Sequence, residues 1–124
     1  MSLAHSAAAA AYGALDPNLV SPMRAEALVF SGVTRRMEAV FADPDSSPAA
    51  KAGVLHDNRR LWLAAATATA DGDNQLPDAL RASIIGLAAF VDRQTSDILR
   101  GKGTAGILSE INRRVIGGLS SGAR

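Results

Sequence analysis

The stretch LPDALRASIIGLAAFVDRQTSDIL, residues 76–99, decides the fold because it carries the clearest helical pattern in the chain. Its apolar side chains recur every three or four residues, which places them on one face of a helix for about six turns. That face consists of Leu80, Ile84, Leu87, Val91, Gln94, Ile98 and Leu99. Gly101 is a typical residue to end such a helix. The stretch therefore predicts a helix that follows Pro77 and buries one side.

Two further long helices precede this one, and each follows the same start signal. Serine caps a helix and proline fits its first turn, so Ser21-Pro22 predicts a helix over about residues 22–42. Ser47-Pro48 likewise predicts a helix over about residues 48–70. A break near His56-Asp57, with the aspartate as a new cap, is an alternative within this last segment.

The two ends of the chain predict shorter helices. One covers residues 2–15, and the other covers about residues 104–118 and is stopped by Gly117-Gly118. No segment alternates with a period of two, so no strand is expected. The prediction is an all-α bundle of four to five helices without a sheet. It forms a single domain over residues 1–124, with 1–20 as a variable N-terminal segment and 120–124 as a flexible tail.

Composition excludes several classes of protein. The chain has 124 residues, 13 basic and 12 acidic side chains, and a net charge of +1, whereas domains that bind nucleic acid broadly are strongly basic. It has no cysteine and only two histidines, which excludes disulfides, thiolate zinc sites and histidine-based metal clusters. No apolar run approaches the roughly 18 residues of a membrane span. We expect a cytoplasmic protein without metal, cofactor or membrane insertion.

The sequence contains no recognisable catalytic motif. There is no GxSxG elbow, and GKGTAG at residues 101–106 lacks the spacing of a phosphate-binding Walker loop. The segment DGDN at residues 71–74 lacks the later glycine and glutamate of a calcium-binding loop. We therefore predict that the protein is not an enzyme and has no catalytic residue.

Three amides occupy unusual places on or beside apolar helix faces. Asn58 lies between Leu55 and Trp62 at helical spacing, Gln94 lies within the face of the fold-deciding helix, and Asn112 lies beside the apolar face of the last helix. Because buried amides need hydrogen-bond partners, the three are expected to converge in a polar network. Such a network commonly fixes helix register; the alternative is an anchor for a partner helix.

Arginine pairs and a single tryptophan complete the candidate binding residues. The pairs are Arg35-Arg36, Arg59-Arg60 and Arg113-Arg114. They are interpreted as solvated faces with local ion pairs to Glu38, Asp57 and Glu110, or alternatively as a patch that recognises an acidic partner or an RNA backbone. Trp62 is interpreted as a core residue or, if exposed, as an interface anchor. The hypothetical partner-binding set is Asn58, Arg59, Arg60, Trp62, Gln94 and Asn112.

Taken in order, these segments resemble the FlaF family of flagellin-synthesis regulators. The resemblance rests on an early AY at residues 11–12 and on four later stretches. These are SPMRAEALVFSGVTRRM at 21–37, HDNRRLW at 56–62, LPDALRASIIGLAAFVDRQTSDIL at 76–99 and LSEINRRVIGGL at 108–119. The NRRLW block with the later LP, FV and QT pairs is the most specific part, and the match covers nearly the whole chain.

The resemblance implies a role in flagellum assembly. Family members are understood as positive factors for flagellin production and export that bind flagellin in the manner of a secretion chaperone. It implies flagellin as a partner, an FlbT-type regulator as a second possible partner, and no active site. The alternative is a post-transcriptional regulator that acts through flagellin messenger RNA or FlbT, although direct RNA contact is not favoured by the near-neutral charge.

Overall fold

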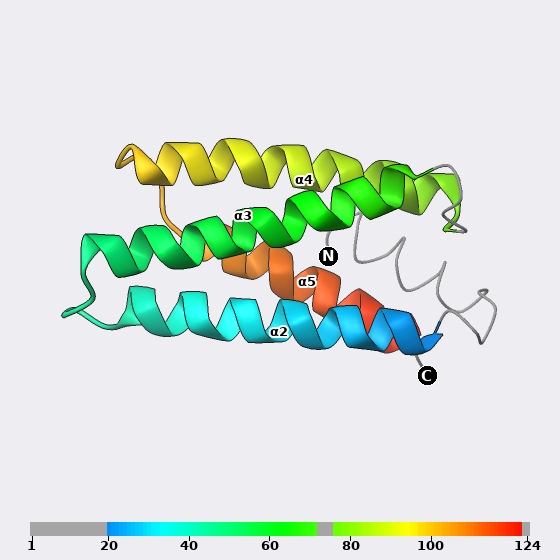
Figure 1. The fold of residues 1–124 in the computed structure, drawn as a ribbon, viewed down its shortest axis with the longest axis horizontal. Coiled ribbons are helices and arrows are strands. Elements are labelled where there is room, and N and C mark those ends of the chain that lie inside the picture. Colours follow the sequence, from blue (N-terminus) through cyan, green and yellow to red (C-terminus); the bar gives the residue numbers. More distant parts are fainter. Residues whose placement is uncertain (1–19, 72–75, 123–124) are drawn as a thin grey trace.

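The structure is a computed structural model that describes the backbone of residues 20–71 and 76–122 and the side chains of 27–71 and 76–118 (Figure 1). Within these ranges it consists of four helices and no strand. They are α2 (Val20–Ala42), α3 (Pro48–Ala70), α4 (Asp78–Leu99) and α5 (Gly106–Gly122). The predicted all-α bundle is confirmed. The helix predicted over residues 2–15 lies outside the described residues.

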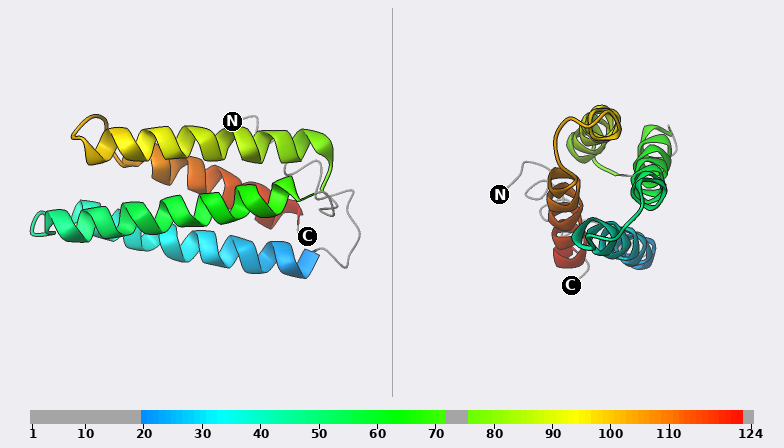
Figure 2. Two further views of the ribbon diagram at one scale, coloured as in Figure 1. Left: turned by 45° about the horizontal axis from the view of Figure 1, so that its top comes forward. Right: turned by 90° about the vertical axis from the view of Figure 1, so that its left-hand side faces the viewer.

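The helices run alternately up and down along one long axis. In Figure 1, α2 and α4 run in one direction while α3 and α5 run in the other. Helix α2 packs against both α3 and α5, and α3 packs against α4. Helices α4 and α5 contact each other far less, although the end-on view in Figure 2 places all four around a common centre. In the described part of the chain, no helix has the length and apolar character needed to cross a membrane.

Local sequence signals account for the start of α3. The hydroxyl oxygen of Ser47 accepts a hydrogen bond from the Ala50 backbone N–H at 3.0 Å, and Pro48 occupies the first turn. The possible break at His56-Asp57 is not present, because α3 continues through both residues to Ala70. Its C-terminal end is held by α4, where Arg81 Nε donates to the Thr69 carbonyl oxygen at 2.9 Å.

Two glycines form the joint between α4 and α5. Gly101 and Gly103 have φ angles of 83° and 84°, in the left-handed region that other residues rarely adopt. The Gly101 N–H bonds to the Ile98 carbonyl at 3.0 Å, and the Lys102 N–H bonds to the Asp97 carbonyl at 2.8 Å. These bonds satisfy carbonyl groups that the end of a helix leaves free.

The predicted end of α5 at Gly117-Gly118 is wrong, because the helix continues to Gly122. Each glycine weakens a helix by roughly 1 kcal/mol relative to alanine, but this penalty does not by itself stop a helix that packs along a neighbour. Helix α5 is packed extensively against α2, and Gly118 is buried. Residues 120–122 of the predicted flexible tail are therefore helical in their backbone.

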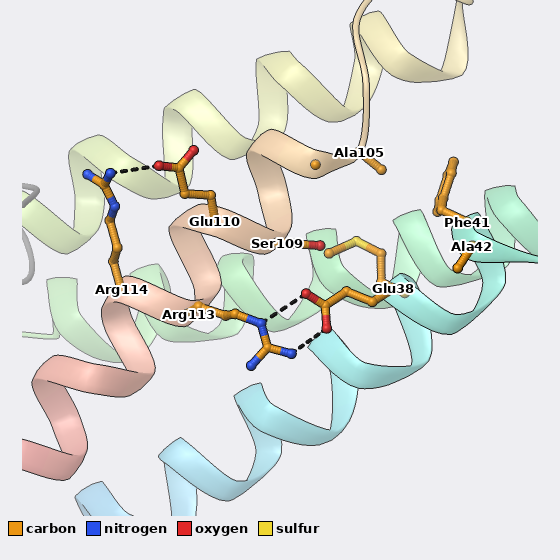
Figure 3. Close-up of a pocket in the computed structure, with 10 residues that line it drawn as sticks. Glu38, Phe41, Ala42, Ala105, Ser109, Glu110, Arg113 and Arg114 are labelled. Atoms are coloured by element: carbon orange, nitrogen blue, oxygen red, sulfur yellow. Dashed lines mark hydrogen bonds and ion pairs between the residues drawn. The ribbon is translucent and has the colours of Figure 1, made fainter.

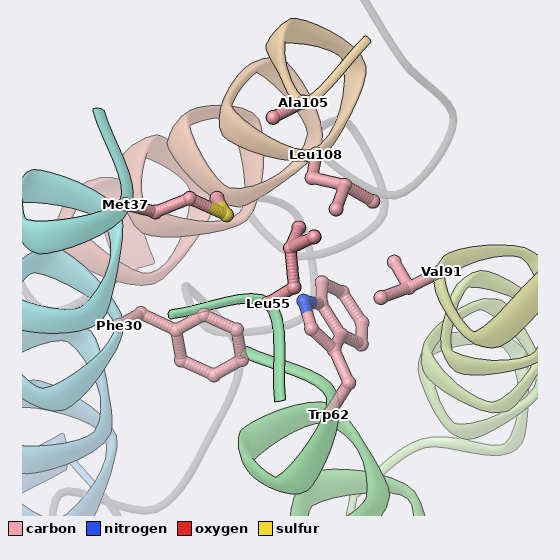
Figure 4. Close-up of a cluster of buried hydrophobic side chains, with 7 residues drawn as sticks. All are labelled: Phe30, Met37, Leu55, Trp62, Val91, Ala105 and Leu108. Carbon is pink, nitrogen blue, oxygen red and sulfur yellow. The ribbon is translucent and has the colours of Figure 1, made fainter. Parts of the chain in front are cut away.

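The core lies between all four helices and contains one aromatic pair (Figure 4). The rings of Phe30 and Trp62 meet edge to face, with centroids 5.3 Å apart and planes at 83°. The buried apolar cluster comprises Phe30, Met37, Leu55, Trp62, Val91, Ala105 and Leu108. Leu99, which the apolar pattern assigned to the buried face, is 40% exposed, because adjacent positions on a helix point about 100° apart and Ile98 takes the inner side.

Candidate functional site

A hydrogen-bond network centred on Asn112 crosses the middle of the bundle. Trp62 Nε1 donates to Asn112 Oδ1 at 2.8 Å. Asn112 Nδ2 donates to Asn58 Oδ1 at 2.7 Å and to Thr34 Oγ1 at 3.0 Å. The network therefore joins α2, α3 and α5 through the side chain of one residue. Asn112, Asn58 and Thr34 are all 0% exposed, so these bonds form without competition from water.

The chemistry of Trp62 fixes the orientation of the Asn112 amide. An indole N–H can only donate, so the oxygen of the Asn112 amide must face it, and both protons of Nδ2 are directed to the other two partners. Thr34 Oγ1 in turn donates to the Phe30 carbonyl at 2.6 Å. Asn58 Nδ2 is buried and has no hydrogen-bond partner, so Asn58 uses only its oxygen in the network.

The predicted convergence of three amides is confirmed for Asn58 and Asn112 but not for Gln94. Gln94 is half-buried and takes no part in these hydrogen bonds, whereas the next residue, Thr95, is fully buried on α4. The third side chain that binds Asn112 Nδ2 is Thr34 of α2. It follows Phe30 by four residues and precedes Met37 by three, so its place on an apolar stripe was a signal that could have identified it.

Burial separates the six proposed partner-binding residues into two groups. Asn58, Trp62 and Asn112 lie inside the core, where only opening of the bundle would expose them. Arg59, Arg60 and Gln94 retain exposed surface. Of the two interpretations that the sequence leaves open for the buried three, their burial and mutual bonds favour fixing the register of the helices over contact with a partner.

Four of the six arginines in these pairs bind nearby carboxylates instead of gathering in one patch. Arg59 donates to Ser96 Oγ at 2.8 Å and lies 3.2 Å from Asp92 Oδ1, which links α3 to α4. Arg60 pairs with Asp57 in the same helix. Arg35 and Arg36 are exposed on α2 and form no ion pair with another described residue.

The last arginine pair contributes to an ion-paired strip along α5. Arg113 binds Glu38 of α2 through two nitrogens, with Nε at 2.9 Å from Oε2, and Arg114 binds Glu110 at 2.6 Å. The hydrogen bond from Arg113 lowers the pKa of Glu38 below its ordinary value of 4.5, against a smaller opposing effect of burial. The same contact raises the pKa of Arg113.

A groove of about 790 Å³ lies between α2 and α5, beside this strip (Figure 3). Its walls combine apolar side chains with ion-paired ones. The lining residues are Met37, Glu38, Phe41, Ala42, Ala105, Gly106, Ser109, Glu110, Arg113 and Arg114. We call this surface the α2–α5 groove. Sequence reasoning missed it because its two walls come from helices more than 60 residues apart, and nothing in a single helix marks a groove.

A second and much smaller hollow lies on the other side of α5. It has a volume of about 110 Å³ and is lined by Leu87, Ile107, Glu110, Ile111 and Arg114. Glu110 and Arg114 border both hollows, so the outer face of α5 separates them. We call this surface the α4–α5 seam. In the described part of the chain, no three His, Cys, Asp or Glu side chains are grouped as they would be to hold a metal ion.

Comparison with known proteins places the chain in a biological setting. No curated protein and no solved structure matches the chain. A family model described as flagellar protein FlaF matches residues 8–119, which include all the residues of the polar network and both hollows. The chain therefore belongs to the FlaF family of flagellar proteins.

Proposed function

We propose that the protein is a non-enzymatic flagellum-assembly factor that binds flagellin in the cytoplasm and so promotes its synthesis and export. Membership of a flagellar family supports the setting. The α2–α5 groove supports the binding mode, and it is the single observation that carries the proposal. An open groove on a helical scaffold suits a partner that presents one amphipathic helix.

The chemistry of the groove fits such a helix. Phe41 and Ala42 give its α2 wall apolar surface that remains partly accessible, and Met37 and Ala105 lie buried beneath. The opposite edge carries Glu110, Arg113 and Arg114, whose charges are already balanced by ion pairs. An apolar face can therefore enter the groove while its polar flanks meet a rim of both signs. The ends of flagellin are amphipathic helices that stay unpaired until the filament forms, so they are the proposed ligand.

The charges favour a protein ligand over RNA. Binding to a phosphate backbone relies on clustered cations that release counterions. Here Arg59, Arg60, Arg113 and Arg114 are all neutralised by carboxylates, and among the described side chains the remaining pair, Arg35 and Arg36 on α2, forms no ion pair. Because the four paired arginines are already neutralised, the post-transcriptional alternative would act through an FlbT-type protein instead of through direct contact with messenger RNA.

The test is co-expression of the chain with its cognate flagellin, followed by affinity purification and size-exclusion chromatography with mass determination. We expect a discrete complex of defined mass that survives raised salt, because its core contact is apolar. Separate elution of the two proteins at micromolar concentration would contradict the proposal. A complex formed only with an FlbT-type regulator, or binding to the flagellin messenger leader with steep salt dependence, would replace it with the regulatory alternative.

A further inference from the structure

The outer side of the α3–α4 pair carries no charge over its middle part. Residues 61–70 of α3 and 82–91 of α4 include no Asp, Glu, Lys or Arg. Two large apolar side chains are exposed there, since Leu63 is 65% and Ile85 is 41% exposed. The other exposed residues of the two stretches are small: Ala64, Thr67, Ala68, Ala70, Ala82, Gly86 and Ala89. We call these nine exposed residues the α3–α4 face. Such an exposed apolar surface is typical of a contact with protein.

Contacts between α3 and α4 place the two uncharged stretches at the same level. The two helices run in opposite directions and pack against each other (Figure 1). Arg59 Nε of α3 lies 3.2 Å from Asp92 Oδ1 of α4. About two and a half turns away, Arg81 Nε donates to the Thr69 carbonyl oxygen at 2.9 Å. Both uncharged stretches lie between these two contacts, so they form one continuous surface.

Exposed charges of opposite sign border the two ends of this face. At one end lie Arg60, whose side chain is 75% exposed, and Arg93, which is also exposed. At the other end lie Asp71, which is exposed, and Asp78, whose side chain is fully exposed. Each helix therefore presents a cation at one end of the face and an anion at the other.

Ion pairs within the helices do not cancel this polarity. Arg60 pairs with Asp57, and Asp78 lies 3.7 Å from Arg81. Arg93 forms no ion pair with another described residue. Among the described side chains that border the face, the Arg93 end therefore has a positive balance and the opposite end a negative one.

The spacing of these charges makes the face complementary to itself. In α3 the cation and the anion are equally far from a point midway between residues 65 and 66, and in α4 from a point midway between residues 85 and 86. Both points lie six to seven residues from the Arg59–Asp92 ion pair, so they are at the same level of the bundle. A second copy, turned by 180° about an axis that crosses both helices at these points, would place each cation opposite an anion.

We propose that the α3–α4 face joins two copies of this chain in a two-fold symmetric dimer. Helix α3 then lies antiparallel on α3 of the other copy, and α4 on α4. The axis places Leu63 opposite Ala68 and Ile85 opposite Gly86, so each large apolar side chain meets a small residue. The contact buries no charged side chain of the face itself and keeps the complementary charges at its rim.

The dimer contact lies apart from the α2–α5 groove. The groove is lined only by residues 37–42 and 105–114, which include no residue of α3 or α4. Both grooves therefore stay open in the dimer. Dimer formation is also independent of the proposed function, because its tests need no flagellin.

The first test is sedimentation equilibrium of the full-length protein over a series of concentrations. We expect a monomer–dimer equilibrium whose Kd rises at least tenfold in Leu63→Glu, because the change places a charge inside the apolar contact. Leu28→Glu is the matched control, since Leu28 is 73% exposed on α2 and should leave the Kd unchanged. A monomer at every concentration, or a Kd that both variants raise equally, would overturn the proposal.

Charge reversal tests the orientation of the two copies. Arg93→Asp and Asp78→Arg each bring like charges together, so each alone should raise the Kd about fivefold at low salt. Combining the two changes exchanges the signs and should restore the Kd of the wild type. A double variant as weak as either single variant would overturn the two-fold arrangement.

Disulfide formation locates the axis, because the chain has no cysteine of its own. An added Cβ meets no atom at Gly86 or at Gly53, so both accept a side chain. Under mild oxidation we expect Gly86→Cys, beside the axis, to form a disulfide with its own copy. Gly53→Cys, which is exposed on α3 outside the face, should stay monomeric under the same conditions. Equal yields of the cross-linked dimer at the two positions would overturn the proposal.

Discussion

At the scale of single residues, Asn112 determines how three helices are placed against each other. Its oxygen accepts from Trp62, and its nitrogen donates to Asn58 and Thr34. An apolar residue at this position could pack at many rotations of α5, whereas the Asn112 amide makes all its hydrogen bonds at only one of them. The register of α5 against α2 and α3 is therefore specified by a few directional bonds in a core that is otherwise aliphatic.

Replacing Asn112, at the centre of the network, should lower the free energy of unfolding more than replacing Asn58, at its edge. Asn112→Leu leaves the Trp62 N–H and the Asn58 amide buried without partners, at about 1–3 kcal/mol for each group. Asn58→Leu removes an amide whose nitrogen already has no partner. We expect the free energy of unfolding to fall by about 2–4 kcal/mol for Asn112→Leu and by clearly less for Asn58→Leu. Urea denaturation followed by circular dichroism measures both, with Gln94→Leu as an amide outside the network. Equal losses for all three would contradict this hierarchy.

The ion pair between Glu38 and Arg113 predicts a dependence of stability on pH. Because the pair lowers the pKa of Glu38, the unfolded chain takes up this proton first as the pH falls. The stabilisation is complete above the ordinary pKa of 4.5 and is lost as the pH falls through the folded-state pKa below it. We expect Glu38→Gln to lower the melting temperature slightly at pH 7 and to have no effect near pH 3. The difference in melting temperature between the wild type and Glu38→Gln should also shrink in high salt. A difference that persists at pH 3 would have a cause other than this ion pair.

The sequence could identify Asn58, Asn112 and Trp62 as important but could not assign their geometry. The sequence pattern alone shows a polar residue on an apolar stripe, and two of the three expected amides, Asn58 and Asn112, do form a hydrogen bond. Gln94 and Thr95 are adjacent, so which of them faces the core depends on a helix rotation of about 100° that apolar periodicity does not resolve. Thr34 escaped notice because threonine forms its own bond to the preceding turn and fits an apolar stripe without strain.

At the scale of elements, caps and glycines set where the helices end. Ser47 and Pro48 determine the start of α3, and Gly101 and Gly103 allow the chain to turn from α4 into α5. The roles of Ser47, Pro48 and Gly101 were readable from the sequence because each acts through local backbone chemistry. The end of α5 was not, since the continuation through Gly117 and Gly118 depends on contact with α2 and overrides the local preference for ending.

Two glycine substitutions should have opposite effects on stability. Gly101 has a φ of 83° with open space around it, so Gly101→Ala meets no neighbour but strains the backbone by about 1–2 kcal/mol. Gly53 lies inside α3, also with open space, so Gly53→Ala should stabilise by roughly 0.5–1 kcal/mol. Thermal unfolding of the two variants measures the contrast. If both changes had the same sign, the positive φ at the joint would not be the reason for glycine there.

At the scale of the whole molecule, the bundle presents two unlike surfaces on either side of α5. The α2–α5 groove has a volume of about 790 Å³ and the α4–α5 seam one of about 110 Å³, and the ion-paired Glu110 and Arg114 line both. The all-α class followed from periodicity alone, but neither surface did, since each needs the relative placement of helices distant in sequence. We propose the α2–α5 groove as the docking site of flagellin.

The most direct test of the central claim is an affinity titration of labelled cognate flagellin with the wild type and two matched variants. Ala42→Arg places a long charged side chain in the α2–α5 groove, whereas Ala39→Arg places it on the same helix outside the groove, and both alanines are exposed. Loss of about 1.4 kcal/mol of binding free energy is a tenfold change in Kd. We predict at least this loss for Ala42→Arg and an unchanged Kd for Ala39→Arg. Equal affinity of all three proteins would contradict the claim that flagellin docks in the groove.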